Sequence, residues 1–181
     1  MPNRRWLDFL ILLVISMFVV SASAAVYYAM LSTSSVTVKA APVHFATGND
    51  SAGILAIGIN ETFATLTLDA YPNVTLYYDQ AVNVTATANK QIRLRPVSIT
   101  PSNDPSVGNF TSIVFRLIRA DSTEAGLLSY TTIGNSWNTP SAMVYAPITS
   151  SEMWTVKVEI TAKAGAFSGV STDIIMAIDV T

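Results

Sequence analysis

The residues of this sequence with the clearest chemical meaning are five asparagines in the pattern Asn-x-Ser/Thr. In an exported protein such an asparagine accepts an N-linked glycan on its amide nitrogen. On strands with alternating side chains, Asn73 and Asn83 fall on the polar side next to threonines, so we expect both amides to face solvent. The alternative interpretation is that Asn and Thr simply occupy exposed strand faces. We predict glycans at all five positions, which are Asn49, Asn60, Asn73, Asn83 and Asn109.

Residues that could catalyse a reaction are few. His44 is the only imidazole and the chain has no cysteine, which excludes disulfides, thiol nucleophiles and zinc sites built on cysteine or on several histidines. No nucleophile-elbow, metalloprotease, P-loop or dinucleotide motif occurs. Asp69 and Asp79 flank a predicted hairpin, where acidic residues serve as turn and strand-end residues. We therefore predict no catalytic residue, no metal and no cofactor, with a glycan-acting enzyme that uses a carboxylate pair as the less favoured alternative.

Charged side chains are sparse, at 12% of the chain, with 10 basic against 12 acidic residues. This balance lacks the basic excess that nucleic-acid binding needs, so we expect no nucleic-acid partner. Arg93 and Arg95 share one face of a predicted strand, where they would protect a sheet edge. Trp137 stands in a segment rich in Gly, Asn and Pro and could stack on a sugar. Trp154 falls on the apolar side of its strand, which predicts core packing.

The N-terminal segment has the layout of an export signal. Arg4 and Arg5 precede an apolar run from Phe9 to Val20, and the small residues Ala22-Ser23-Ala24 follow. This pattern predicts a signal peptide over residues 1–24, cleaved between Ala24 and Ala25. The alternative is that residues 9–31 stay as a membrane anchor, since they are long enough to span a bilayer. Either way the basic residues place the rest of the chain outside, so we expect an extracellular or cell-surface protein.

The remaining sequence predicts an all-β domain over residues 43–181. Apolar and polar residues alternate with a period of two, for example from Trp154 to Ile160 and from Ile174 to Val180, and turn signals separate these runs. Many short strands at such spacing are typical of an antiparallel β-sandwich, here expected to be jelly-roll-like.

Residues 25–42 form an N-terminal extension that needs a partner. The stretch from Ala25 to Leu31 is apolar, aromatic and β-prone, and such a chain end aggregates unless it is buried. It can be buried in its own domain or can complete the sheet of a neighbour as a donor strand. A head-to-tail contact of that kind does not close and produces a filament. The predicted donor-strand residues are Val26, Tyr27, Tyr28, Met30, Leu31, Val36 and Val38.

The order of these features resembles a known family. A signal ending in small residues, the segment Tyr27-Tyr28-Ala29-Met30-Leu31-Ser32-Thr33 and a compact all-β domain are similar to the TasA/camelysin-like biofilm-fibre proteins. The chain is most similar to their archaeal relatives, the subunits of bundling pili and extracellular threads. The resemblance implies a jelly-roll-like sandwich whose N-terminal strand inserts into the adjacent subunit, in fibres that support cell adhesion and biofilm. Metallopeptidase activity described for some members does not carry over, because the sequence lacks a zinc-binding pair.

The resemblance and the residues together lead to one expectation and one alternative. We expect a secreted glycoprotein that polymerises with identical subunits, carries N-linked glycans and meets the membrane only through its signal segment. The alternative is a membrane-anchored cell-surface or surface-layer-associated binding module.

Overall fold

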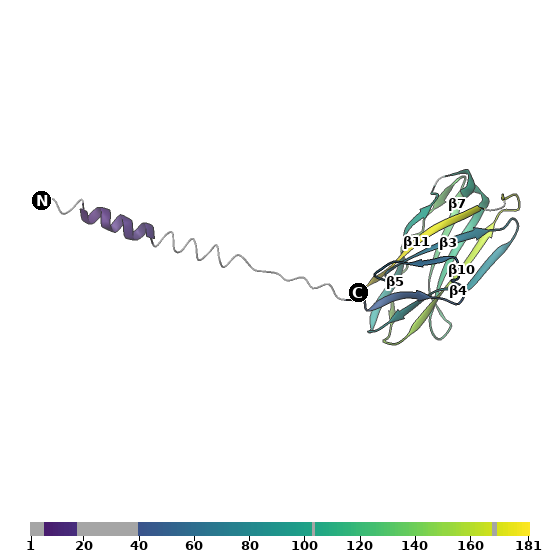
Figure 1. Ribbon diagram of the computed structural model, residues 1–181, viewed down its shortest axis with the longest axis horizontal. Coiled ribbons are helices and arrows are strands. Elements are labelled where there is room, and N and C mark those ends of the chain that lie inside the picture. Colours follow the sequence, from purple (N-terminus) through teal and green to yellow (C-terminus); the bar gives the residue numbers. More distant parts are fainter. Residues whose placement is uncertain (1–5, 18–39, 103, 168–169) are drawn as a thin grey trace. The chain divides into compact units, whose positions relative to one another are not determined.

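The computed structural model describes residues 6–17, 40–102, 104–167 and 170–181 (Figure 1). The chain divides into two units, Met1–Lys39 and Ala40–Thr181. In the first unit, residues 6–17 form a helix of mostly apolar residues inside the predicted export signal. None of the helices in the described part of the chain combines the length and the apolar character needed to cross a bilayer.

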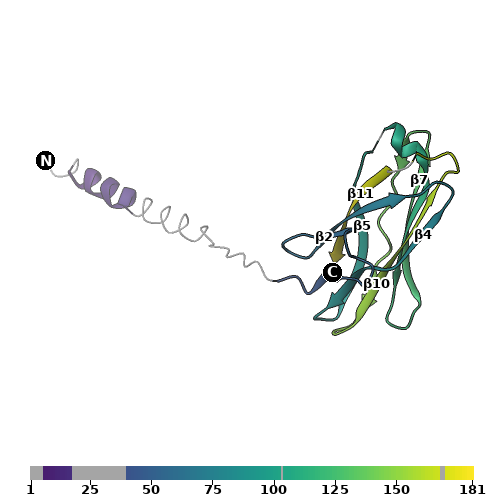
Figure 2. The same ribbon diagram turned by 45° about the vertical axis from the view of Figure 1, so that its right-hand side comes forward.

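The second unit consists of two antiparallel sheets packed face to face (Figures 1 and 2). The six-stranded sheet has the order β1-β4-β10-β6-β7-β8. Its strands are β1 (Val43–Thr47), β4 (Thr75–Ala86), β10 (Met153–Ala162), β6 (Phe110–Ile118), β7 (Glu124–Ile133) and β8 (Ser136–Asn138). The five-stranded sheet has the order β2-β3-β11-β5-β9. Its strands are β2 (Leu55–Ile57), β3 (Phe63–Ala70), β11 (Val170–Val180), β5 (Lys90–Thr100) and β9 (Ala146–Ile148). A short 3-10 helix, η1 (Pro105–Asn109), precedes β6.

The strand order is that of a jelly roll with short additions at three edges. Without β1, β2 and β8, the two sheets are β4-β10-β6-β7 and β3-β11-β5-β9. Successive strands then change sheet at every step from β3 to β11 except between β6 and β7, which is the double Greek-key path of a jelly roll. The prediction of an all-β, antiparallel, jelly-roll-like sandwich is confirmed.

The hydrophobic core lies between the sheets and follows the predicted alternation. On β10 the side chains of Trp154, Val156, Val158 and Ile160 are at most 1% exposed, and β11 contributes Ile174 and Met176 at 0%. The prediction that Trp154 packs in the core is therefore confirmed.

Trp137, which the sequence places in a loop where it could stack on a sugar, lies on a strand instead. It lies on β8 and is 9% exposed, and its ring packs against Phe110 and Tyr130. The Gly134-Asn135 pair makes the tight β7–β8 turn, which returns the chain so that Trp137 pairs with Thr132 and faces the core.

Candidate subunit-interface site

Strand β7 has an open edge along most of its length. β7 has ten residues, and on one side Gly126–Thr131 pair with β6, as does Glu124 beyond a register shift. On the other side only Thr131, Thr132 and Ile133 pair with β8. Among the described residues, the backbone of Glu124–Tyr130 makes no backbone hydrogen bond on this outer side. An edge with unpaired N–H and C=O groups is a template for another strand.

The edge stays open because the chain leaves it after β8. Residues 139–145, here called the strap, connect β8 to β9. Pro140 has no N–H to donate, and the N–H of Met143 donates to the carbonyl of Leu94 on β5 at 3.0 Å. The strap therefore pairs with the five-stranded sheet instead of extending β8 along β7.

The strap still contacts β7 through one side chain. A Cβ built on Gly126 would lie 2.8 Å from the Sδ of Met143, so the absence of a side chain at Gly126 allows this thioether to lie against the strand. The methionine side chain is flexible and offers no backbone hydrogen bond to β7. It therefore covers part of the edge but leaves the N–H and C=O groups of the strand unpaired.

Aromatic side chains pack beneath the open edge. Tyr130 is fully buried, and its ring makes edge contacts with Phe115 and Trp137 at centroid distances of 5.9 and 6.4 Å. Burial raises the pKa of the Tyr130 phenol far above its usual range. The Tyr130 hydroxyl and the indole N–H of Trp137 have no hydrogen-bond partner among the described residues, although both atoms are buried. Buried polar atoms without a hydrogen-bond partner are uncommon in folded proteins. The single chain therefore leaves hydrogen-bonding groups unpaired on this side of the sandwich.

The N-terminal extension joins the domain at the opposite edge of the same sheet. β1 is the first strand of the six-stranded sheet and pairs with β4, from Val43 opposite Ala86 to Thr47 opposite Val82. Four strand spacings of about 4.8 Å separate β1 from β7, or about 19 Å. The predicted donor-strand residues Val26, Tyr27, Tyr28, Met30, Leu31, Val36 and Val38, and the cleavage positions Ala24 and Ala25, lie outside the described residues.

Three of the five predicted glycosylation sites are exposed. Asn49 and Asn60 lie in the loops after β1 and before β3, and Asn73 lies in the turn before β4 with a positive φ of 58°. All three side chains have room for a sugar, so glycosylation at these positions stays a prediction that the geometry favours.

Asn83 and Asn109 are buried, and the expectation that Asn83 faces solvent is wrong. Asn83 is 8% exposed, and its amide nitrogen donates to the carbonyl of Thr47 at 3.0 Å. Asn83 pairs with Ala46 of β1 on one side and with Thr155 of β10 on the other. Alternation alone places Asn83 on the outer face of its strand, but it does not show that these neighbouring strands flank the side chain. Asn109 is 6% exposed and bridges Ser106 and Phe167. A glycan at either amide would displace these hydrogen bonds.

The candidate catalytic residues are dispersed. His44 lies 4.0 Å from Glu61, and Asp79 pairs with Lys157 at 3.0 Å. Within the described ranges, no group of three or more His, Asp or Glu side chains could hold a metal ion. A groove of about 680 Å³ lies on the outer face of the six-stranded sheet beside Arg119, Glu152 and Lys157.

Neither a protein-family model nor a curated protein matches this chain. The site therefore has to be judged on its own geometry.

Proposed function

We propose that this protein is a structural subunit of an extracellular filament that assembles by donor-strand complementation. The extension at residues 25–39 of one copy pairs with the open β7 edge, Glu124–Tyr130, of the next copy. Backbone hydrogen bonds along the edge supply affinity, and alternate side chains of the extension replace the Met143 contact. Such fibres would serve adhesion and biofilm formation.

One observation carries this proposal: β1, the strand that follows the extension in the chain, and the open part of β7 lie toward opposite edges of one sheet. Two complementary features placed in this way make a heterologous contact, because one copy uses β1 and its neighbour uses β7. A heterologous contact that does not close into a ring continues into a filament. A dimer built on a single self-complementary edge would require both features on the same side.

Two of the three buried polar atoms without a partner among the described residues support the same edge; the third is the indole N–H of Trp154 on β10. Tyr130 and Trp137 keep a buried hydroxyl and a buried N–H without partners beside β7. An acceptor that the neighbouring copy supplied to either atom would offset part of its desolvation.

Cysteine cross-linking tests the register directly, because the natural chain contains no cysteine. In the mature chain, residues 25–181, we pair Ser129→Cys on β7 with single cysteines placed in turn at residues 26 to 31. Oxidation should produce a ladder of disulfide-linked oligomers on a non-reducing gel for alternate positions. The matched control replaces Ser129→Cys by Thr67→Cys, an exposed position on β3 of the other sheet, and should give no ladder.

Four outcomes decide against the proposal. Equal ladders with both cysteine pairs indicate random collisions. A mature chain that stays monomeric in electron micrographs, or a chain lacking residues 25–39 that still forms fibres, excludes donor-strand assembly. A native protein whose N-terminal sequence begins at Met1 favours the anchored binding module.

A further inference from the structure

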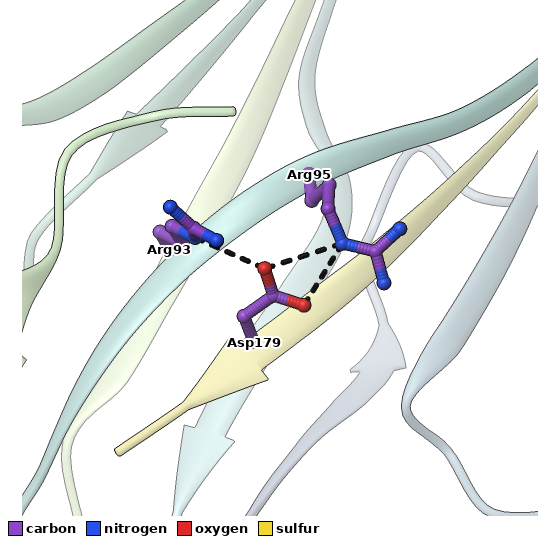
Figure 3. A network of polar contacts seen from close by, with 3 residues as sticks. All are labelled: Arg93, Arg95 and Asp179. Carbon is purple, nitrogen blue, oxygen red and sulfur yellow. Dashed lines mark hydrogen bonds and ion pairs between the residues drawn. The ribbon is translucent and has the colours of Figure 1, made fainter. Parts of the chain in front are cut away.

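The outer face of the five-stranded sheet carries a compact cationic cluster. Arg93 and Arg95 of β5 both reach the carboxylate of Asp179 on β11 (Figure 3). The Nε atoms of Arg93 and Arg95 lie 3.0 Å from Asp179 Oδ2 and Oδ1, respectively. β9 pairs only with Lys90–Ile92 of β5, and beyond it the strap donates a single hydrogen bond to Leu94, so the two arginines lie along a partly covered stretch of β5.

The cluster keeps an excess of positive charge and free donors. Two guanidinium groups face one carboxylate, and both use only Nε for this contact. Neither arginine contacts Asp179 through its terminal nitrogens, and Figure 3 shows those of Arg95 directed away from the carboxylate. Among the described residues no acceptor contacts these terminal nitrogens, although the side chains are only 32% and 42% exposed. A guanidinium held in this way offers a fork of N–H donors that fits an oxyanion.

Neighbouring residues hold the arginines in position and surround them with apolar surface. The guanidinium carbon of Arg93 lies 4.6 Å from the centre of the Tyr145 ring. Phe63, Ala177 and Arg95 stand in one row across β3, β11 and β5, where Phe63 is 46% exposed. Asp179 is held as an anion, because the hydrogen bonds from Arg95 and Arg93 outweigh its burial and lower its pKa.

A second copy of the domain offers almost no free carboxylate to this cluster. Nearly all carboxylates of Ala40–Thr181 already contact donors of their own chain, and among the described residues Asp69 alone lacks a polar contact. The short contacts join Asp50 to Gln80, Asp79 to Lys157, Asp104 to Ser106, Asp121 to Thr123, Glu124 to Arg116, Glu152 to Thr149 and Asp173 to Thr67. Longer ion pairs join Glu61 to His44 and Glu159 to Arg116. A docking copy would have to break one of these contacts or use Asp69.

We propose that this cluster binds the oxyanions of an acidic polysaccharide. The arginine forks pair with carboxylate or sulfate groups, and the exposed rings of Phe63 and Tyr145 pack against the apolar faces of the sugar rings. The site lies on a sheet face and does not depend on the filament contact at β7.

Calorimetric titration of the mature chain with polygalacturonate and with dextran sulfate tests this site and separates a carboxylate from a sulfate ligand. The test variant Arg93→Gln/Arg95→Gln/Asp179→Asn removes all three charges, so no partner is left buried and unpaired. The matched control Arg116→Gln/Arg119→Gln/Glu124→Gln changes the net charge by the same amount on the other sheet. We expect at least tenfold weaker binding for the test variant and less than threefold weakening for the control.

The remaining outcomes overturn the proposal. Equal weakening in both variants shows general charge attraction, and unchanged binding in the test variant excludes the cluster. Neutral dextran bound as tightly as the acidic polymers excludes oxyanion recognition. Poly-L-glutamate bound more tightly than either polysaccharide, with loss in the test variant, assigns the cluster to an acidic peptide instead. Near-ultraviolet circular dichroism confirms that each variant is folded.

Discussion

Replacing Tyr130 by phenylalanine tests whether the core beside β7 contains an unsatisfied hydroxyl. The side chain is fully buried, its ring contacts involve Phe115 and Trp137, and its hydroxyl has no partner among the described residues. Phenylalanine keeps the ring contacts and removes only the unpaired group. An unsatisfied buried hydroxyl costs about 1–3 kcal/mol, so the free energy of unfolding should rise by about 1 kcal/mol.

Urea unfolding of residues 40–181 measures this change, because that fragment contains the whole core. With a typical dependence of about 2 kcal/mol per molar urea, the midpoint should rise by about 0.5 M at pH 7. A variant that is destabilised by about 1 kcal/mol or more would show that the hydroxyl has a partner in the single chain, and would refute the reasoning.

The same variant makes a prediction about pH. Burial raises the pKa of Tyr130 in the folded chain, whereas the unfolded chain titrates near pH 10. A group whose pKa is raised on folding contributes stability below its unfolded pKa and loses it as the pH rises further. Wild type should therefore lose stability above about pH 10 faster than Tyr130→Phe, by up to about 1.4 kcal/mol per pH unit. The other tyrosines are common to both proteins, so a difference that stays constant from pH 9 to pH 11 contradicts a buried phenol.

Three further predictions follow from other contacts. Gly48→Ala should lower the free energy of unfolding by about 3 kcal/mol in urea unfolding, because its Cβ would overlap the carbonyl of Gln80. Gly126→Ala should lower it by about 1 kcal/mol or less, since only the flexible Met143 side chain has to move. Similar losses for the two variants would contradict this contrast. Peptide mass spectrometry of the native protein should find glycans on Asn49, Asn60 and Asn73 and unmodified Asn83 and Asn109, and a glycan on Asn83 would contradict its burial. Asp179 has a lowered pKa in the folded state, so it stabilises the domain above about pH 4, and this contribution is lost as the pH falls through its folded pKa. The Arg93→Gln/Arg95→Gln/Asp179→Asn variant should lack that part of the pH dependence of stability. Identical profiles of stability against pH for the variant and wild type would count against the ion-pair geometry.

Side-chain alternation predicted the sandwich because each core strand buries one face. Trp154 and Ile174 could be assigned to the core in this way, since both belong to long strands with a regular period. The burial of Asn83 could not be predicted, because it depends on β1, which pairs with β4, and on the loop after β1, which also hydrogen-bonds to β4. Trp137 was misplaced since its neighbours Gly134 and Asn135 signal a turn, and a turn does not reveal which way the next three residues face.

The open β7 edge could not be predicted from local sequence. Pro140 indicates a break, but only the strand order shows that, among the described residues, Glu124–Tyr130 have no hydrogen-bonded strand on their outer side. The Arg93–Asp179 contact likewise joins residues that are far apart in the chain, and Arg93 and Arg95 alone suggested no partner.

The placement of β1 and β7 at opposite edges has a consequence for fibre growth. A filament built through these edges is polar, because one terminus displays an unfilled β7 edge and the other carries an unpaired extension. A copy that lacks residues 25–39 keeps its β7 edge, so it can accept the extension at one terminus and then offers nothing to the next subunit. Such copies would stop elongation at that terminus alone, and their proportion in a mixture would set the mean fibre length.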